Sequence, residues 1–479
     1  MESAEGRCLR SATRAARPVW VALDALASRF ALRKSLRGAP QREGEREEAP
    51  FLPRGYNPPM PDLTRDDLVY DWNTVGAVAR PPHRIEFDDE TLRDGLQCPS
   101  VRSPGLEEKV RLLHLMSELG LGYCNIGLPG AGPHVVKTVT RLAEEIRDAR
   151  LKLEPNCAAR TVEADIRPVA EIQQKVGLPI EVSTFIGSST IRAYTEDWSV
   201  QTMLKHAVAA LQFAAKEGLS VMFVTEDTTR AHPQTLEALY GAALEHGAKR
   251  LCFCDTVGHA TPDGARNLIA WAVELVAKSG RKDVKIDWHG HMDRGLGVLN
   301  NIAALQAGAH RVHGTALGIG ERAGNAPLDL TLVNLKLLGW IDNDLRRLGD
   351  YVRLTSEVTG VPIPIGYPVF GRDAFETGTG VHAAAVIKAL QKGDSWLADR
   401  VYSGVPAGDF GLQQVIRVGP MSGKSNVVWW LKEHGYDASD ERVERLFKAA
   451  KDARELLTDD ELHRLAKAGG VAAGAPSPR

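Results

Sequence analysis

The chain has 479 residues, of which 43% are apolar and 25% are charged, a balance typical of a globular protein that excludes a fibrous or fully disordered one. Its 59 Lys and Arg residues against 61 Asp and Glu residues give a net charge of -2, so no global field favours nucleic acid or an anionic membrane surface. Six sparse cysteines exclude a disulfide framework, and no run approaches the roughly 18 apolar residues of a membrane span, so we expect a cytoplasmic protein.

The first 62 residues have the composition of an extension and a linker. Residues 1–38 are rich in Arg, Ala and Ser, which fits a disordered extension and also resembles an organellar transit peptide. Residues 40–61 are charged and contain several prolines, as linkers do. We therefore expect ordered structure to begin near Leu63, and the role of the extension stays open.

From there to about residue 345, short β-rich segments alternate with segments of helical length. Eight strands are predicted, at residues 84–88, 123–126, 152–154, 180–185, 220–225, 250–254, 284–288 and 311–315. Helices are predicted after them, at residues 106–119, 135–149, 162–176, 200–217, 233–245, 262–278, 297–307 and 327–338. Eight such units predict an α/β fold, a (β/α)₈ TIM barrel over residues 63–345, with a doubly wound open sheet as the alternative.

Polar side chains follow most of the predicted strands. The active sites of such barrels lie where the strands end and the βα loops begin, so these side chains should meet at one end of the barrel. In chain order they are Asp89, Arg93, Asp94, residues 184–189, Glu226, Asp227, Asp255, His289, His291, Glu321, Arg322 and Asn325.

His289 and His291 flank Gly290 at the end of the seventh predicted strand. Residues two apart in an extended chain point the same way, so both imidazoles can reach one metal ion. Asp94 is the natural third ligand, because only the eighth strand separates the first strand from the seventh. This donor set suits Zn²⁺, Mn²⁺ or Mg²⁺ without choosing among them, and a polar loop without a metal is the alternative.

Three ordered segments resemble the hallmark motifs of the DRE-TIM metallolyases. They are residues 89–97 (DETLRDGLQ), 289–301 (HGHMDRGLGVLNN) and 318–325 (GIGERAGN). The resemblance covers about residues 85–431 and points to the condensing branch of 2-isopropylmalate and homocitrate synthases. It implies a divalent cation on Asp94, His289 and His291, with Asn325 supporting the metal shell, and acetyl-CoA as co-substrate.

The resemblance also assigns catalytic roles to Arg93 and Glu226. The bound ion would hold a 2-oxo acid by its carbonyl and carboxylate oxygens. Arg93 would bind the substrate and stabilise the oxyanion that forms, and Glu226 would help to remove a proton from the methyl group of acetyl-CoA. The alternatives are that Arg93 forms only a structural salt bridge and that Glu226 only fixes Arg93.

Further residues resemble substrate-binding and partner-reaching positions of the family. Arg160 resembles an arginine that anchors the substrate carboxylate, and Thr184 a hydroxyl that lines the same pocket. Residues 346–479 resemble the linker and small helical subdomain of these synthases. There His382 and Tyr402 match residues that assist catalysis in the neighbouring subunit, which implies a homodimer with shared active sites.

Three positions depart from the family pattern and put the substrate in doubt more than the reaction. Leu96 stands where an acidic residue is usual, Asn125 where a glutamate is common, and Met292 inside the usual His-Asn-Asp stretch. We expect condensation with 2-oxoisovalerate to give 2-isopropylmalate in leucine biosynthesis. Homocitrate or citramalate synthesis is the nearest alternative, and an acyl-CoA lyase, a metal-dependent hydrolase or a non-catalytic scaffold is more remote. The Cys252 and Cys254 pair is predicted to belong to the core.

Overall fold

The computed structural model describes residues 64–76 and 80–468, so the extension predicted for residues 1–62 lies outside the described residues. The chain divides into two units, Met1–Gly76 and Ala77–Arg479. The first contains α2 (Arg65–Leu68) and η2 (Trp72–Thr74). The Thr64 backbone N–H and hydroxyl donate to the Asp67 carboxylate, which fixes the start of α2. No described helix is long and apolar enough to span a membrane.

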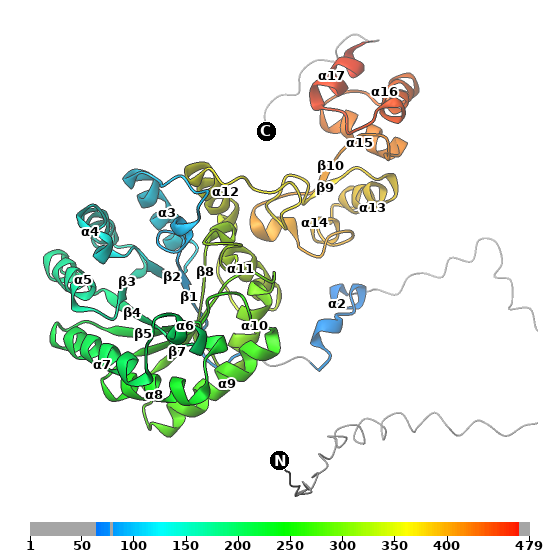
Figure 1. Cartoon of the computed structure of the whole chain (residues 1–479). Helices are drawn as coiled ribbons and strands as arrows, with labels where there is room; N and C mark the ends of the chain where they lie inside the picture. Colours follow the sequence, from blue (N-terminus) through cyan, green and yellow to red (C-terminus); the bar gives the residue numbers. More distant parts are fainter. Residues whose placement is uncertain (1–63, 77–79, 469–479) are drawn as a thin grey trace, which may run out of the picture. The chain divides into compact units, whose positions relative to one another are not determined.

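In the second unit, eight parallel strands close into a barrel in chain order (Figure 1). They are β1 (Glu86–Asp89), β2 (Gly122–Asn125), β3 (Leu153–Arg160), β4 (Glu181–Gly187), β5 (Val221–Glu226), β6 (Arg250–Asp255), β7 (Lys285–Gly290) and β8 (Arg311–Gly314). The barrel closes where β8 pairs with β1, with Val312 opposite Phe87. The TIM-barrel prediction is confirmed, and the open-sheet alternative is wrong.

The third strand is longer than predicted, because it continues through Pro155 and Asn156 to Arg160. Both residue types are depleted in strands, which is why the sequence pattern ended the strand early. In the fold the Asn156 amide donates to Asp88 at 2.8 and 2.9 Å and accepts from the Ser183 hydroxyl at 3.0 Å. The polar side chain is therefore satisfied across the barrel interior.

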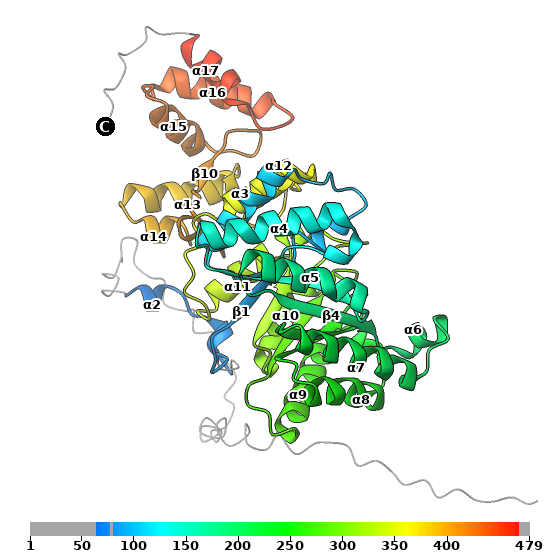
Figure 2. The same ribbon diagram turned by 90° about the vertical axis from the view of Figure 1, so that its left-hand side faces the viewer.

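Helices follow the strands and cover the barrel (Figures 1 and 2). They are α3 (Leu106–Glu118), α4 (Pro133–Asp148), α5 (Glu163–Val176), α6 (Thr190–Thr195), α7 (Val200–Lys216), α8 (Pro233–Glu245), α9 (Pro262–Lys278), α10 (Gly297–Ala307) and α11 (Leu328–Leu337). Short 3₁₀ turns are η3 (Gly95–Gln97), η4 (Pro129–Ala131), η5 (Thr228–Arg230) and η6 (Ala316–Gly318). The sequence pattern did not predict α6, which projects beyond the neighbouring helices in Figure 2.

The helix ends follow from local chemistry. Pro133, Pro233 and Pro262 occupy first turns, where the missing N–H costs no helical hydrogen bond. The Thr261 hydroxyl caps α9 by accepting from the Gly264 N–H at 3.2 Å. Gly177 ends α5 in the left-handed conformation that glycine tolerates. These signals explain why the helix positions were readable from the sequence.

The barrel interior contains a layer of buried charge. Arg311 is fully buried and donates to Asp287 at 2.6 Å and to Glu181 at 2.8 Å. Arg250 donates to the other oxygen of Asp287 at 2.8 Å. Both guanidinium groups also lie over the Tyr123 ring, 4.6 and 4.9 Å from its centroid. Each buried charge in this layer therefore has an opposite partner.

The segment after the barrel begins with α12 (Leu348–Thr359), which packs on the barrel. The Tyr351 hydroxyl donates to the Asp89 carboxylate, and the backbone N–H of Arg102 donates to the Thr359 carbonyl at 2.8 Å. The C-terminal subdomain follows, with a two-stranded sheet and a small apolar core around Trp430. Its elements are β9 (Glu376–Thr377), α13 (Gly380–Gln391), α14 (Ser395–Ala398), η7 (Ala407–Phe410), β10 (Val415–Ile416), α15 (Lys424–Glu433), α16 (Asp440–Asp452) and α17 (Asp459–Lys467).

Replacing Arg311 by Met should destabilise the fold, because it leaves the buried Asp287 carboxylate and the partly buried Glu181 carboxylate short of a cation. We expect the free energy of unfolding to fall by about 3–5 kcal/mol, measured by urea denaturation. Lys249→Met is the matched control, since Lys249 and Asp283 form an exposed pair whose loss should cost under about 1 kcal/mol. Equal losses in the two variants would contradict this account.

Candidate active site

A pocket of about 170 Å³ lies among the carboxyl ends of the barrel strands. Its walls carry charged, polar and apolar groups from most of the strands and from the loops that follow them. They are Glu90, Arg93, Asp94, Gln97, Asn125, Ala158, Ser183, Phe185, Met222, Val224, Glu226, Cys252, Cys254, Thr256, His289, His291, His313, Glu321 and Arg322. Polar side chains that follow the strands thus meet at one end of the barrel, as the sequence pattern predicted.

Asp94, His289 and His291 bring three ligand atoms together in this pocket. His289 Nε2 lies 3.2 Å from His291 Nε2, and Asp94 Oδ2 lies 3.7 and 3.6 Å from these two nitrogens. Tetrahedral ligands about 2.1 Å from one ion lie about 3.4 Å apart. Asp94 Oδ2 is buried and has no hydrogen-bond partner within the described residues. The three residues therefore fit a divalent cation.

The loop after β1 holds Arg93 beside the metal-ligand group. Arg93 Nη1 donates to Asp94 Oδ1 at 2.7 Å, and Nη2 donates to the Glu90 carboxylate. Burial by itself lowers the pKa of the Arg93 guanidinium, but the adjacent Asp94 and Glu90 carboxylates raise it above its usual value. Arg93 is thus a fixed cation that engages one oxygen of Asp94 and leaves the other free to bind an ion.

The two histidines of this group have opposite pKa shifts. Burial lowers the pKa of His289, but the Glu90 carboxylate offsets this effect, and the pKa rises to about 9. Burial and the neighbouring His289 lower the pKa of His291 to about 4. His291 is therefore neutral at pH 7, the form that binds metals.

Glu226 is the last residue of β5 and faces the same pocket. Burial raises the pKa of its carboxyl group, although the nearby Arg192 and Arg93 guanidinium groups act in the opposite direction. A carboxylate with a raised pKa is a stronger proton acceptor than an exposed one. Glu226 therefore presents to the pocket a carboxyl group that accepts a proton more readily than an exposed glutamate does.

Asn325 lies next to His291 through a backbone bridge, but it does not line the pocket. Its side chain is buried and its amide nitrogen donates to the Ile319 carbonyl at 3.2 Å. A Cβ at Gly320 would lie only 2.3 Å from this nitrogen, so the loop needs glycine there. These contacts stabilise the loop that carries Asn325. The role of Asn325 in the metal shell stays a prediction.

The two other predicted substrate-binding residues also lie outside the pocket walls. Arg160 ends β3 with 64% of its side chain exposed and pairs with Asp165 at 2.7 Å. Thr184 is fully buried in β4, and its hydroxyl has no partner among the residues that the structure describes. The structure thus brings Asp94, His289, His291, Arg93 and Glu226 together and leaves Arg160 and Thr184 apart from them.

His382 and Tyr402 stack on each other in the C-terminal subdomain, with ring centroids 4.2 Å apart. Neither side chain lines the pocket of its own chain. Both are exposed, Tyr402 by 49%. Their predicted contribution to a neighbouring subunit stays a prediction.

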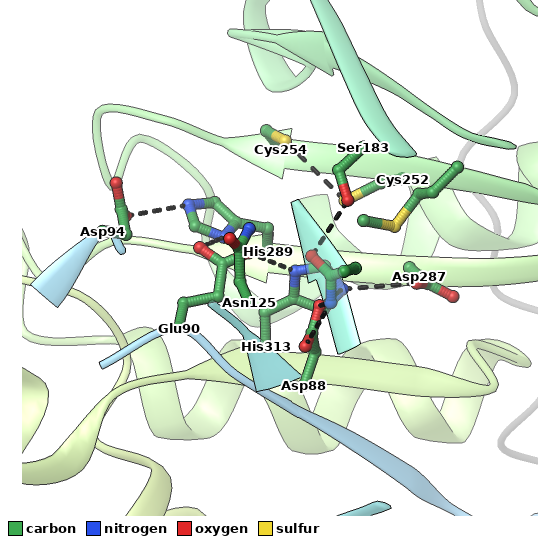
Figure 3. Close-up of polar contacts among 12 residues, drawn as sticks. Asp88, Glu90, Asp94, Asn125, Ser183, Cys252, Cys254, Asp287, His289 and His313 are labelled. Atoms are coloured by element: carbon green, nitrogen blue, oxygen red, sulfur yellow. Dashed lines mark hydrogen bonds and ion pairs between the residues drawn. The ribbon is translucent and has the colours of Figure 1, made fainter. Parts of the chain in front are cut away.

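Several residues of the site were not predicted from the sequence, and Figure 3 shows them close together. Glu90 and His313 face each other in the barrel interior. Cys252 and Cys254 lie in a buried apolar cluster with Met222, as expected, and they also line the pocket. Asn125 also lines it, and its amide nitrogen has no partner in the described part of the chain. For Cys252, Cys254 and His313, the alternation of side chains along β6 and β8 is the signal that could have placed them on the inward face.

Comparison with known proteins connects this geometry to a family. The HMGL-like family model matches residues 84–353, more than half of the chain. A protein of Methanopyrus kandleri named as a probable 2-isopropylmalate synthase is 34% identical over 375 residues, 78% of this chain and 70% of that protein. The homocitrate synthase AksA of the same organism is 33% identical over 81% of this chain and 92% of its own length.

A solved structure shows the same fold. The HMG-CoA lyase of Bacillus subtilis aligns with a TM-score of 0.50 at 21% sequence identity, over 60% of this chain and 97% of the lyase. At 21% identity this match shows the fold alone. The family model and the two synthases match at the level of sequence. The chain therefore belongs to the HMGL-like family of DRE-TIM barrels, as its three motifs indicated.

Proposed function

We propose that this protein condenses acetyl-CoA with a 2-oxo acid and then hydrolyses the thioester to release CoA. The observation that carries the proposal is the convergence of Asp94, His289 and His291 beside a fixed cation, Arg93, and a buried carboxylate, Glu226. Relatives named as 2-isopropylmalate and homocitrate synthases, which match about four-fifths of the chain, support this reaction class.

When bound to Asp94, His289 and His291, a divalent cation supplies Lewis-acid polarisation of a 2-oxo acid carbonyl. Glu226 takes a proton from the acetyl methyl group, and the resulting carbanion forms a bond to the 2-oxo carbon. Arg93 stabilises the negative charge that moves onto oxygen. Water then cleaves the thioester and the CoA thiol leaves, so the acetyl carbons remain in the product.

The acceptor that fits best is 2-oxoisovalerate, which gives 2-isopropylmalate in leucine biosynthesis. Ala158, Phe185, Met222 and Val224 supply apolar walls that suit a branched aliphatic side chain. Homocitrate synthesis requires an acceptor with a second carboxylate, and Arg160 is held by Asp165 outside the pocket. Citramalate synthesis, with a smaller acceptor, is the nearer alternative.

We also propose a cytoplasmic homodimer in which the C-terminal subdomain of one chain serves the site of the other. The support is the stacked His382 and Tyr402 pair, which is exposed and absent from the pocket of its own chain. An imidazole beside a phenol is suited to proton transfer at the acetyl group. The pair would then assist enolisation together with Glu226.

The proposed reaction is tested by following free thiol release from acetyl-CoA with a panel of 2-oxo acids. We expect release with 2-oxoisovalerate, slower release with pyruvate and 2-oxoglutarate, and loss of release when a chelator removes the metal. The control is acetyl-CoA without an acceptor. If no acceptor supports thiol release from the metal-loaded protein, the condensing function is wrong.

His291→Ala and Asp94→Ala should each lower the rate of thiol release by at least about 100-fold, because each removes one of three metal ligands. The matched control is His206→Ala on α7, since His206 stacks on Trp198 and does not line the pocket. The rate of the control should stay near that of the wild type. Full metal-stimulated activity in both pocket variants would place the ion elsewhere.

The pH profile should report Glu226. A general base works only after it loses its proton, so kcat should rise with pH. Because burial raises the pKa of Glu226, the inflection should lie above the ordinary pKa of a glutamate. Glu226→Gln should lower kcat by about 10²–10⁴-fold. Arg192→Met should shift the acid limb to higher pH, because Arg192 lowers the Glu226 pKa. An unshifted limb would show that another group titrates.

A further inference from the structure

Glu90 is a buried carboxylate that the proposed chemistry does not use. Its Oε1 lies 2.9 Å from His313 Nδ1, and its Oε2 lies 3.4 Å from His289 Nδ1 (Figure 3). Arg93 Nη2 also donates to Oε2. One carboxylate thus contacts a metal-site histidine, the oxyanion-stabilising arginine and a third basic side chain.

His313 fixes this carboxylate from the opposite side. It is 1% exposed, and its Nε2 lies 3.3 Å from Asp287 Oδ2, while Nδ1 faces Glu90. Carboxylates face both ring nitrogens, so both nitrogens donate and the ring is an imidazolium. Asp287 is held in turn by Arg250 and Arg311. Glu90 is therefore connected to the fully paired charge layer of the barrel.

The contact to His289 sets which of its nitrogens can bind an ion. Glu90 Oε2 faces His289 Nδ1 at 3.4 Å, so in the neutral ring, which is the form that binds an ion, the proton is favoured on Nδ1 and the lone pair on Nε2, the atom that faces Asp94 and His291. His291 Nδ1 is buried and has no partner of this kind in the described structure. The orientation of the ligand group therefore depends on His289 and on the carboxylate that holds it.

We infer that Glu90, anchored by His313, is a positioning residue that orients His289 for the metal and Arg93 for the oxyanion. This inference rests on the metal site of the proposed function. It connects the buried charge layer to the pocket through an unbroken series of contacts, Asp287 to His313 to Glu90 to His289. None of the three motifs assigned a role to Glu90 or His313.

A second ion held by Glu90, His289 and His313 is the alternative, since their ligand atoms lie within 4.8 Å of one another. Two observations oppose it. The Arg93 guanidinium lies against Glu90 Oε2, and both nitrogens of His313 donate to carboxylates. A cation there would lie beside a permanent positive charge and would have to displace a buried proton.

The test is a titration of the full-length apo protein with Co²⁺, followed by the visible absorption bands of the bound ion. Glu90→Gln keeps the side-chain volume but weakens acceptance from His289, Arg93 and His313 together. We expect the Co²⁺ dissociation constant to rise by about 10–100-fold and the bands to shift. A stoichiometry of two ions in the wild type, falling to one in Glu90→Gln, would support the second-ion alternative and overturn the inference.

Glu181→Gln is the matched control, because Glu181 is a partly buried carboxylate that also pairs with an arginine but does not line the pocket. Its Co²⁺ affinity should stay within about twofold of the wild type, since its contacts avoid the metal ligands. Urea denaturation of each variant separates lost folding from lost positioning. A folded Glu90→Gln variant with wild-type affinity and spectrum would overturn the inference.

His313→Gln tests the anchor from the other side and serves if Glu90→Gln does not fold. His313→Gln should weaken Co²⁺ binding. In the Glu90→Gln background it should raise the Co²⁺ dissociation constant little further, because both changes act through the contact between His313 and Glu90. Additive effects would show that His313 acts independently of Glu90. If the wild type binds no Co²⁺ at all, the metal site itself fails, which is a different result from failure of the positioning role.

Discussion

The pairing of β8 with β1 is the constraint on which the rest of the molecule depends. It closes the barrel and brings the loop after β1 beside the end of β7, although almost 200 residues separate Asp94 from His289 in the chain. Side chains at the carboxyl ends of the strands then converge without any long loop to place them. The metal-ligand geometry is thus a consequence of barrel closure and strand register.

The closed barrel contains charged side chains in its interior, and each of them is paired with a side chain of opposite charge. Asp287 lies at the centre, with two guanidinium groups and the His313 ring around it. Removing an ion from water costs several kcal/mol unless an opposite charge and hydrogen bonds replace the solvent. The same pairing that satisfies this layer fixes Glu90 and, through Glu90, one wall of the pocket. Stability and site geometry therefore have a common physical origin in this barrel.

Features that depend on periodicity and motif spacing could be predicted from the sequence. Features that depend on contacts between distant residues could not. The alternation of strands and helices and the His289 and His291 spacing predicted the barrel and its metal-site residues. Asn156 misled the strand assignment because its partners come from β1 and β4. Strand alternation predicts only that His313 faces inward, since its role depends on carboxylates from β7 and from the residue after β1 that only the closed sheet brings near.

The three departures from the family pattern are not equivalent in the structure. Met292 accepts a hydrogen bond from the Gly297 N–H at 3.2 Å and packs at the start of α10, and Leu96 lies in η3 outside the pocket walls. Asn125 alone lines the pocket, where it presents an uncharged amide in place of an acid. A buried N–H donor favours a substrate oxygen, whereas a carboxylate repels one. The Asn125 departure therefore changes what the pocket offers to an acceptor, and none of the three departures alters Asp94, His289 or His291.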